Sequence, residues 1–417
     1  MNIYQQTIGR IQYYLFIVVV VSLPFPQIFL RYACVAWIIT WALEGRWLRL
    51  SNLKSQLSKS KLHIPFLLFG LWYAYKLLSG LWAADTGAWE SQMERYMTFA
   101  LIVPVGLWGL NTYYDWKKIG RALVISCVCA VPIYVILFVV LYHCPQLVDM
   151  LNWKGEWDFT YPSWFPFFAE NITVVKHRLY LCSVELFGAF VAYLLYRYQW
   201  KRFIPCLLIL LSLIPLTASR QAILTITALV VVALIYLVPV KYRKLSAVGI
   251  IIVGIGVGWG LLKVHPRMQN FDAQTIGKLQ EVSADHDVRL NIWGAALQHP
   301  EDYIVHGIGG GQSQEYMVQQ YNDLGLVQCA QERYNCHNQY LEEIVEGGVI
   351  GLILFLVAWL AIPFCTPPHA RQIAWLFVML FICDMFTESV FGRFDGVALW
   401  VVGLLLIGIQ AHAKREE

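Results

Sequence analysis

One histidine, His337, closes a long polar stretch just before a run of apolar residues. An imidazole titrates near neutral pH and can accept a proton from a hydroxyl group, so His337 could act as a general base. An isolated histidine at the start of a predicted helix could equally be a capping or packing residue. The residue type therefore allows acid–base chemistry here without establishing it.

Two arginines, Arg178 and Arg220, lie next to apolar runs, where charged groups are costly and are usually paired or functional. Arg220 occupies a minimal turn between two such runs, and Arg178 begins another. Arg289 lies in the first turn of a predicted helix, where free N–H groups also favour an anion, so it could bind phosphate. Two ordinary readings stay open. Arg220 could extend its charge to the membrane surface, and Arg289 could pair with Asp285.

Other polar residues could support these groups. Glu388 lies at the end of an apolar run, where it could pair with an arginine or position His337. His177 and Tyr180 flank Arg178, and Asn338 follows the histidine directly. Cys329 and Cys336 lie in the same polar stretch as His337, and an oxidising compartment would let them form a disulfide.

Two further patterns give little evidence of a binding site. The Gly307–Gly311 segment lacks the Lys-Ser/Thr of a phosphate-binding loop, so we interpret it as a flexible turn. His299 and His306 form no metal-ligand pattern with nearby cysteines or aspartates, so we predict no bound metal.

The elements that carry these residues are predicted to be membrane-spanning helices. The chain has 417 residues, of which 58% are hydrophobic and 14% are charged. A soluble protein has about 25% charged residues, so a soluble enzyme, a nucleic-acid binder and a disordered scaffold are all disfavoured. The apolar runs are continuous rather than alternating, which favours helices over a β-barrel. The sequence predicts an all-α polytopic membrane protein.

We expect twelve transmembrane helices. Their ranges are 11–26, 28–45, 65–83, 97–111, 122–142, 178–196, 203–218, 221–240, 246–263, 341–363, 372–389 and 396–411. With the N-terminus inside, the cytoplasmic pieces carry 18 Lys/Arg against three acidic residues, as the positive-inside rule requires. Both termini are therefore predicted to be cytoplasmic. The net charge of +4 reflects this topology and indicates no nucleic-acid partner.

Two polar segments are predicted to lie outside the cytoplasm. The segment 143–176 is aromatic, and we expect its rings at the membrane interface, although they could stack on sugars. The segment 264–340 is a large loop between helices 9 and 10, and long loops on a rigid scaffold often carry function. The chain thus divides into 1–263 (helices 1–9), 264–340 (the loop with the candidate residues) and 341–417 (helices 10–12).

Taken together, these features resemble the O-antigen ligase superfamily. Its signature is a histidine, a small polar residue, nine arbitrary positions, a glycine, two more positions and a second glycine. His337-Asn338 and Gly348-Val349-Ile350-Gly351 match it. Arg220 and Arg289 resemble the two arginines of the family. The twelve spans and the large loop also agree, so the resemblance covers essentially the whole chain.

The resemblance implies a GT-C-like membrane glycosyltransferase of the bacterial inner membrane that needs no metal, cofactor or ATP. Such an enzyme inverts the anomeric centre as it transfers a glycan from undecaprenyl pyrophosphate on the periplasmic face. The acceptor would be a sugar hydroxyl of lipid A-core in lipopolysaccharide biosynthesis, and the other partners would be membrane lipids. His337 would be the general base. Arg220 and Arg289 would bind the pyrophosphate, with help from Arg178.

The alternatives within this resemblance are a Wzy-type O-antigen or exopolysaccharide polymerase and a protein O-oligosaccharyltransferase. The polymerase shares the same motifs, and we favour the ligase on the arrangement of loop, arginines and histidine. A protein acceptor is disfavoured because the sequence ends at Glu417, soon after the last predicted span. A lipid-linked glycan transporter is the rival from another class. It should place charges near the membrane midplane, where Lys76 is almost the only basic residue.

Overall fold

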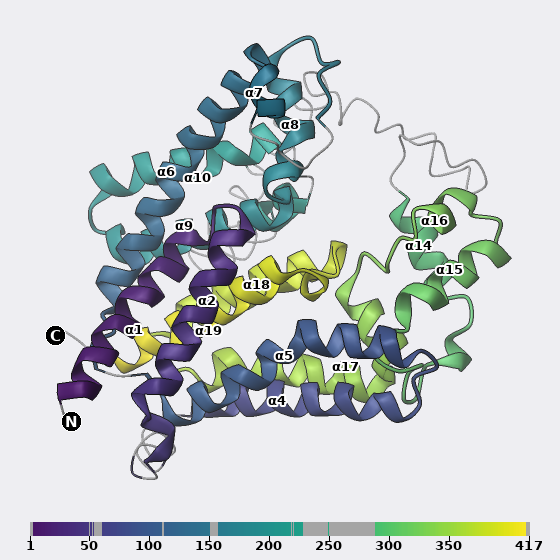
Figure 1. Cartoon of the computed structure of the whole chain (residues 1–417), viewed down its shortest axis with the longest axis horizontal. Coiled ribbons are helices and arrows are strands. Elements are labelled where there is room, and N and C mark those ends of the chain that lie inside the picture. The colour runs from purple at the N-terminus through teal and green to yellow at the C-terminus, as the bar shows by residue number, and fades with distance from the viewer. Residues whose placement is uncertain are drawn as a thin grey trace. The chain divides into compact units, whose positions relative to one another are not determined.

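The structure is a computed structural model that describes residues 3–49, 51, 53, 61–110, 112–150, 157–217, 219, 221–227, 249 and 288–413. All regular elements among these residues are helices (Figure 1). Seven of the described helices are long and apolar enough to cross a membrane. An all-helical, polytopic organisation is therefore supported, whereas the number of twelve spans and the GT-C-like fold stay predictions.

The chain divides into two compact units. Unit 1 comprises Met1–Tyr14, Ala36–Trp116 and Ala273–Glu417, and unit 2 comprises Leu15–Val35 and Lys117–Asp272. The first two helices, α1 (Ile3–Ser22) and α2 (Gln27–Glu44), contribute to both. The predicted division at 263/264 and 340/341 stays a prediction.

Among the described residues, five long helices lie wholly in unit 1. They are α4 (His63–Leu78), α5 (Thr86–Trp108), α17 (Gln339–Cys365), α18 (Arg371–Thr387) and α19 (Phe394–His412). Helix α4 packs against α5 and α17, and α17 also packs against α18 (Figure 1). Interlocking aromatic rings fill the space between them, namely Phe69, Phe99, Trp359, Phe391 and Trp400. Short 3-10 turns at Arg46–Leu48, Ser79–Leu81 and Val390–Gly392 complete the unit.

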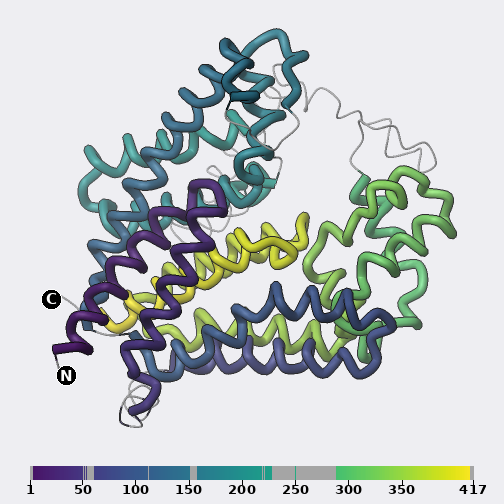
Figure 2. The backbone as a smooth tube through the Cα atoms, viewed as in Figure 1, coloured from purple at the N-terminus to yellow at the C-terminus, as the bar shows by residue number. Residues whose placement is uncertain are grey.

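Short helices precede α17 and form a small core of their own in unit 1. They are α14 (Arg289–Ala296), α15 (Ser313–Asp323) and α16 (Val327–Gln331), with a 3-10 turn at Pro300–Asp302. The core contains Ile292, Met317, Tyr321, Cys329 and Cys336. Figure 2 shows this part of the chain, in green, leading directly into α17. The described part of the large loop is thus a packed helical layer, and it positions His337 just before the start of α17.

Helix α17 is broken at Gly348, the first glycine of the signature, whose φ is 62° and ψ is −167°. The break frees backbone groups that a neighbouring segment satisfies, because Val349 N donates to Ile304 O at 2.8 Å and Ile308 N donates to Val345 O at 2.9 Å. A Cβ on Gly348 would lie 2.3 Å from Val305 O, so only glycine fits this close approach.

The interpretation of Gly307–Gly311 as a flexible turn is therefore wrong. Gly307, Gly309 and Gly311 all have positive φ, and the segment packs directly onto α17 beside its break. A Cβ on Gly307 would lie 2.2 Å from the backbone of Glu346. These glycines allow the backbone of the loop to lie close to the backbone of α17, so their role is close packing and not loop flexibility.

Unit 2 contains α6 (Trp116–His143), α7 (Gln146–Met150), α8 (Trp164–Val175), α9 (Arg178–Tyr196) and α10 (Trp200–Thr217). Helix α10 packs against α8 and α9. The expected position of the aromatic segment at a membrane interface stays a prediction, and some of its rings pack against α6 and α8. Trp157 stacks on Phe167 with ring centroids 6.0 Å apart, and Phe138 contacts both rings. These rings form a core that fixes α8, because mutual packing buries more apolar surface than separate display would.

The predicted span boundaries hold best where apolar runs are sharply bounded. The range 178–196 coincides with α9, and the first pair of spans is two helices separated by a turn at Pro24 and Pro26. Helix α5 begins well before the predicted residue 97. Asp85 caps it by accepting from Gly87 N at 2.8 Å, which extends the helix through polar residues that hydropathy assigns to a loop. Of the predicted spans 221–240 and 246–263, most residues lie outside the described part of the chain.

Candidate active site

The start of α17 is fixed by Asn338. Its Oδ1 atom accepts from Tyr340 N at 2.9 Å and from Leu341 N at 3.1 Å, which makes it the N-cap of the helix. Its Nδ2 atom donates to Phe386 O at 3.0 Å, near the end of α18. The small polar residue of the signature therefore starts one helix and ties it to the end of another. This capping role belongs to Asn338 and not to the histidine before it.

His337 is held in an unusual backbone conformation directly before this cap. Its φ is 41°, a left-handed value that non-glycine residues seldom adopt and that clusters at functional sites. Its backbone N–H donates to Asn335 Oδ1 at 3.1 Å, which helps to fix the turn. The side chain is 26% exposed, so the ring is accessible while its orientation is constrained.

Glu388 orients the imidazole of His337. The Nδ1 atom of the ring lies 3.1 Å from Glu388 Oε1, and the glutamate side chain is only 10% exposed. An ionised carboxylate only accepts hydrogen bonds, so the pair assigns the proton of the neutral ring to Nδ1. That tautomer leaves Nε2 as the basic atom. A carboxylate that holds a histidine in this way is a common arrangement for a general base.

Arg289 reaches the same place from the large loop. It is the first residue of α14, and its Nε atom donates to Thr387 O at 3.1 Å. Trp293, one turn further along, packs edge-on against Phe386 with ring centroids 5.4 Å apart. Two consecutive residues at the end of α18, Thr387 and Glu388, thus hold the arginine and the histidine. The predicted partner Asp285 lies outside the described residues.

A fully buried ionic network lies one to two turns further along α17. The Lys76 Nζ atom, from α4, lies 3.1 Å from Glu343 Oε2 and 2.9 Å from Glu346 Oε2. All three side chains have an exposure of 0%. A buried charge without a partner is strongly destabilising, so α4 and α17 are locked in register by this triad.

The network extends from the triad to the glycine segment. Glu346 Oε1 accepts from Ser313 Oγ at 2.8 Å and from Gly311 N at 3.1 Å, and Gln92 of α5 also donates to this carboxylate. Glu343 accepts from Trp72 Nε1 and from Gln339 Nε2, both at 2.9 Å. These hydrogen bonds join three long helices and the loop into one rigid support for the residues that precede it, including His337.

Sequence reasoning missed this network. In the sequence, Lys76 stands out as a lone basic residue within a predicted span, and nothing near it in the chain identifies its two partners. The available signal was the cluster of Glu342, Glu343 and Glu346 in an otherwise apolar run. Carboxylates at that depth require a cation, and Lys76 is the basic residue at comparable depth.

The other predicted residues belong to unit 2. Arg178 is the first residue of α9, and its Nη1 atom is buried without a hydrogen bond in the part of the chain that the structure describes. His177 precedes it at the cap position, and the rings of His177 and Tyr180 have centroids 5.4 Å apart. A buried guanidinium nitrogen with hydrogen-bonding capacity to spare suits the binding of a phosphate oxygen.

Arg220 lies outside the described residues. Its neighbours show how this turn begins, because Ser219 Oγ accepts from Ala222 N at 3.3 Å and starts the following helix. Thr217, at the end of α10, contacts Cys182 of α9 with 3.2 Å between Oγ1 and Sγ. The chain entering this turn therefore lies one turn from Arg178 along α9.

The remaining prediction concerns the two loop cysteines. The structure holds Cys329 and Cys336 as free thiols, both fully buried in the small core of unit 1. Burial raises the pKa of both thiols, which keeps them protonated and slow to react. Their pairing stays a prediction. Within the described ranges, no three His, Cys, Asp or Glu side chains gather in a metal-binding arrangement.

Comparison with known proteins agrees with the resemblance drawn from the motifs. Residues 205–356 match the family model described as O-antigen ligase. The matched segment contains Arg220, Arg289, His337 and both signature glycines. A search of curated proteins found no match. The resemblance to the O-antigen ligase and Wzy superfamily is confirmed, and the match covers ligases and polymerases alike.

Proposed function

We propose that this chain, which carries an O-antigen ligase domain, is a membrane glycosyltransferase of the ligase type. It would move a glycan from undecaprenyl pyrophosphate to a sugar hydroxyl of lipid A-core. The observation that carries the proposal is the convergence on the end of α18, where Thr387 and Glu388 hold Arg289 and His337. In this proposal, the arrangement supplies a base with a fixed tautomer and a phosphate-binding side chain next to each other.

The histidine would supply the acid–base step. His337 Nε2 would take the proton of the acceptor hydroxyl while its oxygen attacks the anomeric carbon of the donor. The bond from that carbon to the pyrophosphate oxygen breaks, and its electron pair leaves with the undecaprenyl pyrophosphate. Glu388 would stabilise the imidazolium that forms, and the proton would then pass to solvent. General base catalysis of this kind contributes roughly 10²–10⁴-fold.

The arginines would stabilise the leaving group. The pyrophosphate gains negative charge as the glycosidic bond breaks, and guanidinium groups bind such oxygens through charge-assisted, often bidentate contacts. Arg289 lies at the N-terminus of α14, where the helix dipole also favours an anion. Arg178 has a buried nitrogen that makes no hydrogen bond within the described residues. We propose Arg220 as the third member of this set on the strength of the motif.

The energy source follows from the predicted location. We propose that the site faces the periplasm from the bacterial inner membrane, with both termini in the cytoplasm, because the basic residues lie in the opposite loops. ATP is not supplied on that side. An activated, membrane-borne pyrophosphate donor meets this requirement, since its bond to the sugar already stores the necessary free energy.

The proposal is tested with purified protein, an undecaprenyl-pyrophosphate-linked glycan and lipid A-core, without added ATP. We expect a ladder on lipid A-core in a lipopolysaccharide gel, and no ladder when that acceptor is omitted. Longer lipid-linked chains in donor-only reactions would instead establish a polymerase. No product in either reaction would contradict a transferase and favour a transporter.

A set of variants links this activity to the site. His337→Ala, Arg220→Ala and Arg289→Ala should each abolish transfer while the protein still inserts in the membrane at normal levels. Arg333→Ala is a matched control, because Arg333 is an exposed loop arginine paired with Glu315 at the surface. Near-normal product from all three site variants would remove the proposed site.

A further inference from the structure

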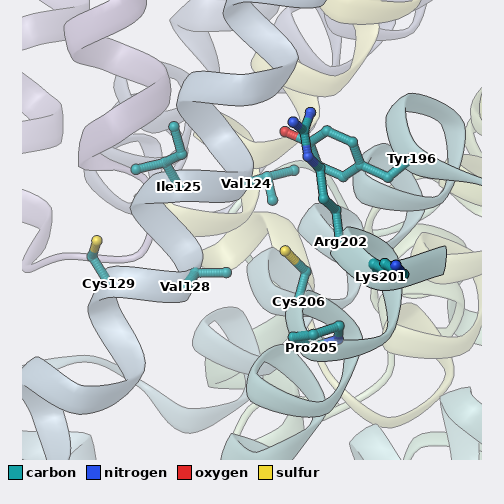
Figure 3. A pocket seen from close by; sticks show the side chains of 9 residues that line it. All are labelled: Val124, Ile125, Val128, Cys129, Tyr196, Lys201, Arg202, Pro205 and Cys206. Atoms are coloured by element: carbon teal, nitrogen blue, oxygen red, sulfur yellow. The ribbon is translucent and has the colours of Figure 1, made fainter. Parts of the chain in front are cut away.

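Unit 2 contains a second candidate binding site, far along α9 from Arg178. A cavity of about 270 Å³ opens between α6 and α10. Figure 3 shows its two walls, one from α6 and one from the start of α10. The lining is largely apolar and includes Val124, Val128, Cys129, Pro205 and Cys206. Such a lining suits a hydrocarbon chain.

One end of this cavity is basic. Lys201 and Arg202 belong to its lining, and both side chains are exposed. Arg202 donates from Nη1 to Gln199 Oε1 at 3.0 Å, and its other guanidinium N–H groups make no hydrogen bond within the described residues. The N-terminal part of α6 lies beside the end of α9, because a Cβ on Gly120 would lie 3.1 Å from Val191.

That proximity brings basic residues of two helix ends together. Arg121 lies in the first two turns of α6, and Arg197, Lys201 and Arg202 lie where α9 ends and α10 begins. No acidic residue occurs in 186–217, the part of the sequence that carries these last three residues. The positive-inside rule places both helix ends at the cytoplasmic face. An apolar cavity under a net positive rim is complementary to a lipid with an anionic headgroup.

We propose that this cavity binds an anionic diacyl phospholipid of the cytoplasmic leaflet. One acyl chain would lie against Val124, Val128 and Cys206, and the phosphate would lie between Lys201 and Arg202. Basic pockets between spanning helices on the cytoplasmic side select anionic headgroups in this way. A zwitterionic phospholipid fills the apolar part equally well but gains little from the rim.

Two native cysteines allow a labelling test without the introduction of new cysteines. Cys129 lines the cavity and is exposed, whereas Cys144 is exposed beyond the opposite end of α6. The detergent-solubilised full chain is treated with a maleimide after addition of dioleoyl phosphatidylglycerol or dioleoyl phosphatidylethanolamine. Peptide mass spectrometry then gives the labelling rate at each cysteine. We expect phosphatidylglycerol to slow labelling at Cys129 several-fold relative to phosphatidylethanolamine, with Cys144 unchanged.

Variants locate the effect. In the Lys201→Gln, Arg202→Gln double variant, about fivefold more phosphatidylglycerol per removed charge should be needed for the same protection. The Arg49→Gln, Lys61→Gln double variant removes the same charge from another basic loop and should behave as the native chain. Equal Cys129 labelling with both lipids would overturn the proposal. So would protection that survives unchanged in the Lys201, Arg202 variant.

Discussion

Two buried carboxylates, one in each unit, have opposite surroundings, because one has many polar partners and the other has none within the described residues. Glu346 in unit 1 contacts Lys76 and accepts hydrogen bonds from Gln92, Gly311 and Ser313. Glu185 in unit 2 is also 0% exposed, yet neither of its oxygens has a hydrogen bond within the described residues. Both lie on helices long and apolar enough to span a membrane.

The difference indicates what each carboxylate does for the fold. A buried charge contributes rigidity only when partners surround it, and breaking such a set leaves the remaining charges uncompensated. A buried carboxyl group without partners contributes no such bracing and is best tolerated when neutral. In unit 1, Lys76, Glu343 and Glu346 therefore form an electrostatic brace, which stabilises the helix that follows the candidate base. The side chain of Glu185 supplies no equivalent in unit 2.

The largest expected effect comes from removing the cation of the brace. Lys76→Met leaves Glu343 and Glu346 buried without their partner, which should lower the free energy of unfolding by about 3–5 kcal/mol. Thermal unfolding in detergent, followed by size-exclusion chromatography, measures this loss. Lys61→Met, at an exposed position, should have almost no effect. Equal stability of both variants would show that the triad does not brace the unit.

Removing all three charges sharpens the comparison. The triple variant Lys76→Met, Glu343→Gln, Glu346→Gln leaves no unpaired charge, so it should recover part of the stability that Lys76→Met loses. A triple variant no more stable than Lys76→Met would mean that packing, and not charge pairing, dominates the effect.

The two carboxylates can also be compared directly by the same substitution. Glu346→Gln places an amide NH₂ group among four donors, so we expect a loss of about 3 kcal/mol. Glu185→Gln exchanges one unpartnered polar group for another and should change stability by less than about 1 kcal/mol. The same unfolding assay measures both. A larger loss for Glu185→Gln would reveal that unit 2 holds a partner for it.

These contrasts show which features of the site can be predicted from the sequence. The types and positions of His337 and Glu388 at the ends of apolar runs, and of Arg289 at the start of a predicted helix in the large loop, are enough to select them as candidates. The glutamate cluster of α17 indicates that a buried cation is needed, but which glutamates contact Lys76 depends on the packing of α4 on α17, since Glu346 lies 270 positions from Lys76. The conformation of Gly307–Gly311 depends in the same way on a break in a distant helix.

A smaller effect is expected from filling the backbone break in α17 at Gly348. Gly348→Ala forces a Cβ against Val305 O and strains a positive φ, so the loss should be about 1–3 kcal/mol. Gly408→Ala is the matched control, because a Cβ there would meet nothing within 4 Å and alanine favours the helix. Equal behaviour of the two variants would show that α17 can close its break without penalty.

The most direct test of the central claim is the rate of glycan transfer by purified His337→Ala and Glu388→Gln, compared with the native chain. If Glu388 positions a catalytic base, His337→Ala should lower the rate roughly 10²–10⁴-fold with the protein still folded. Glu388→Gln should lower it less, and it should shift the pH at which the remaining activity is half-maximal. A His337→Ala protein that transfers glycan at the native rate would contradict the account.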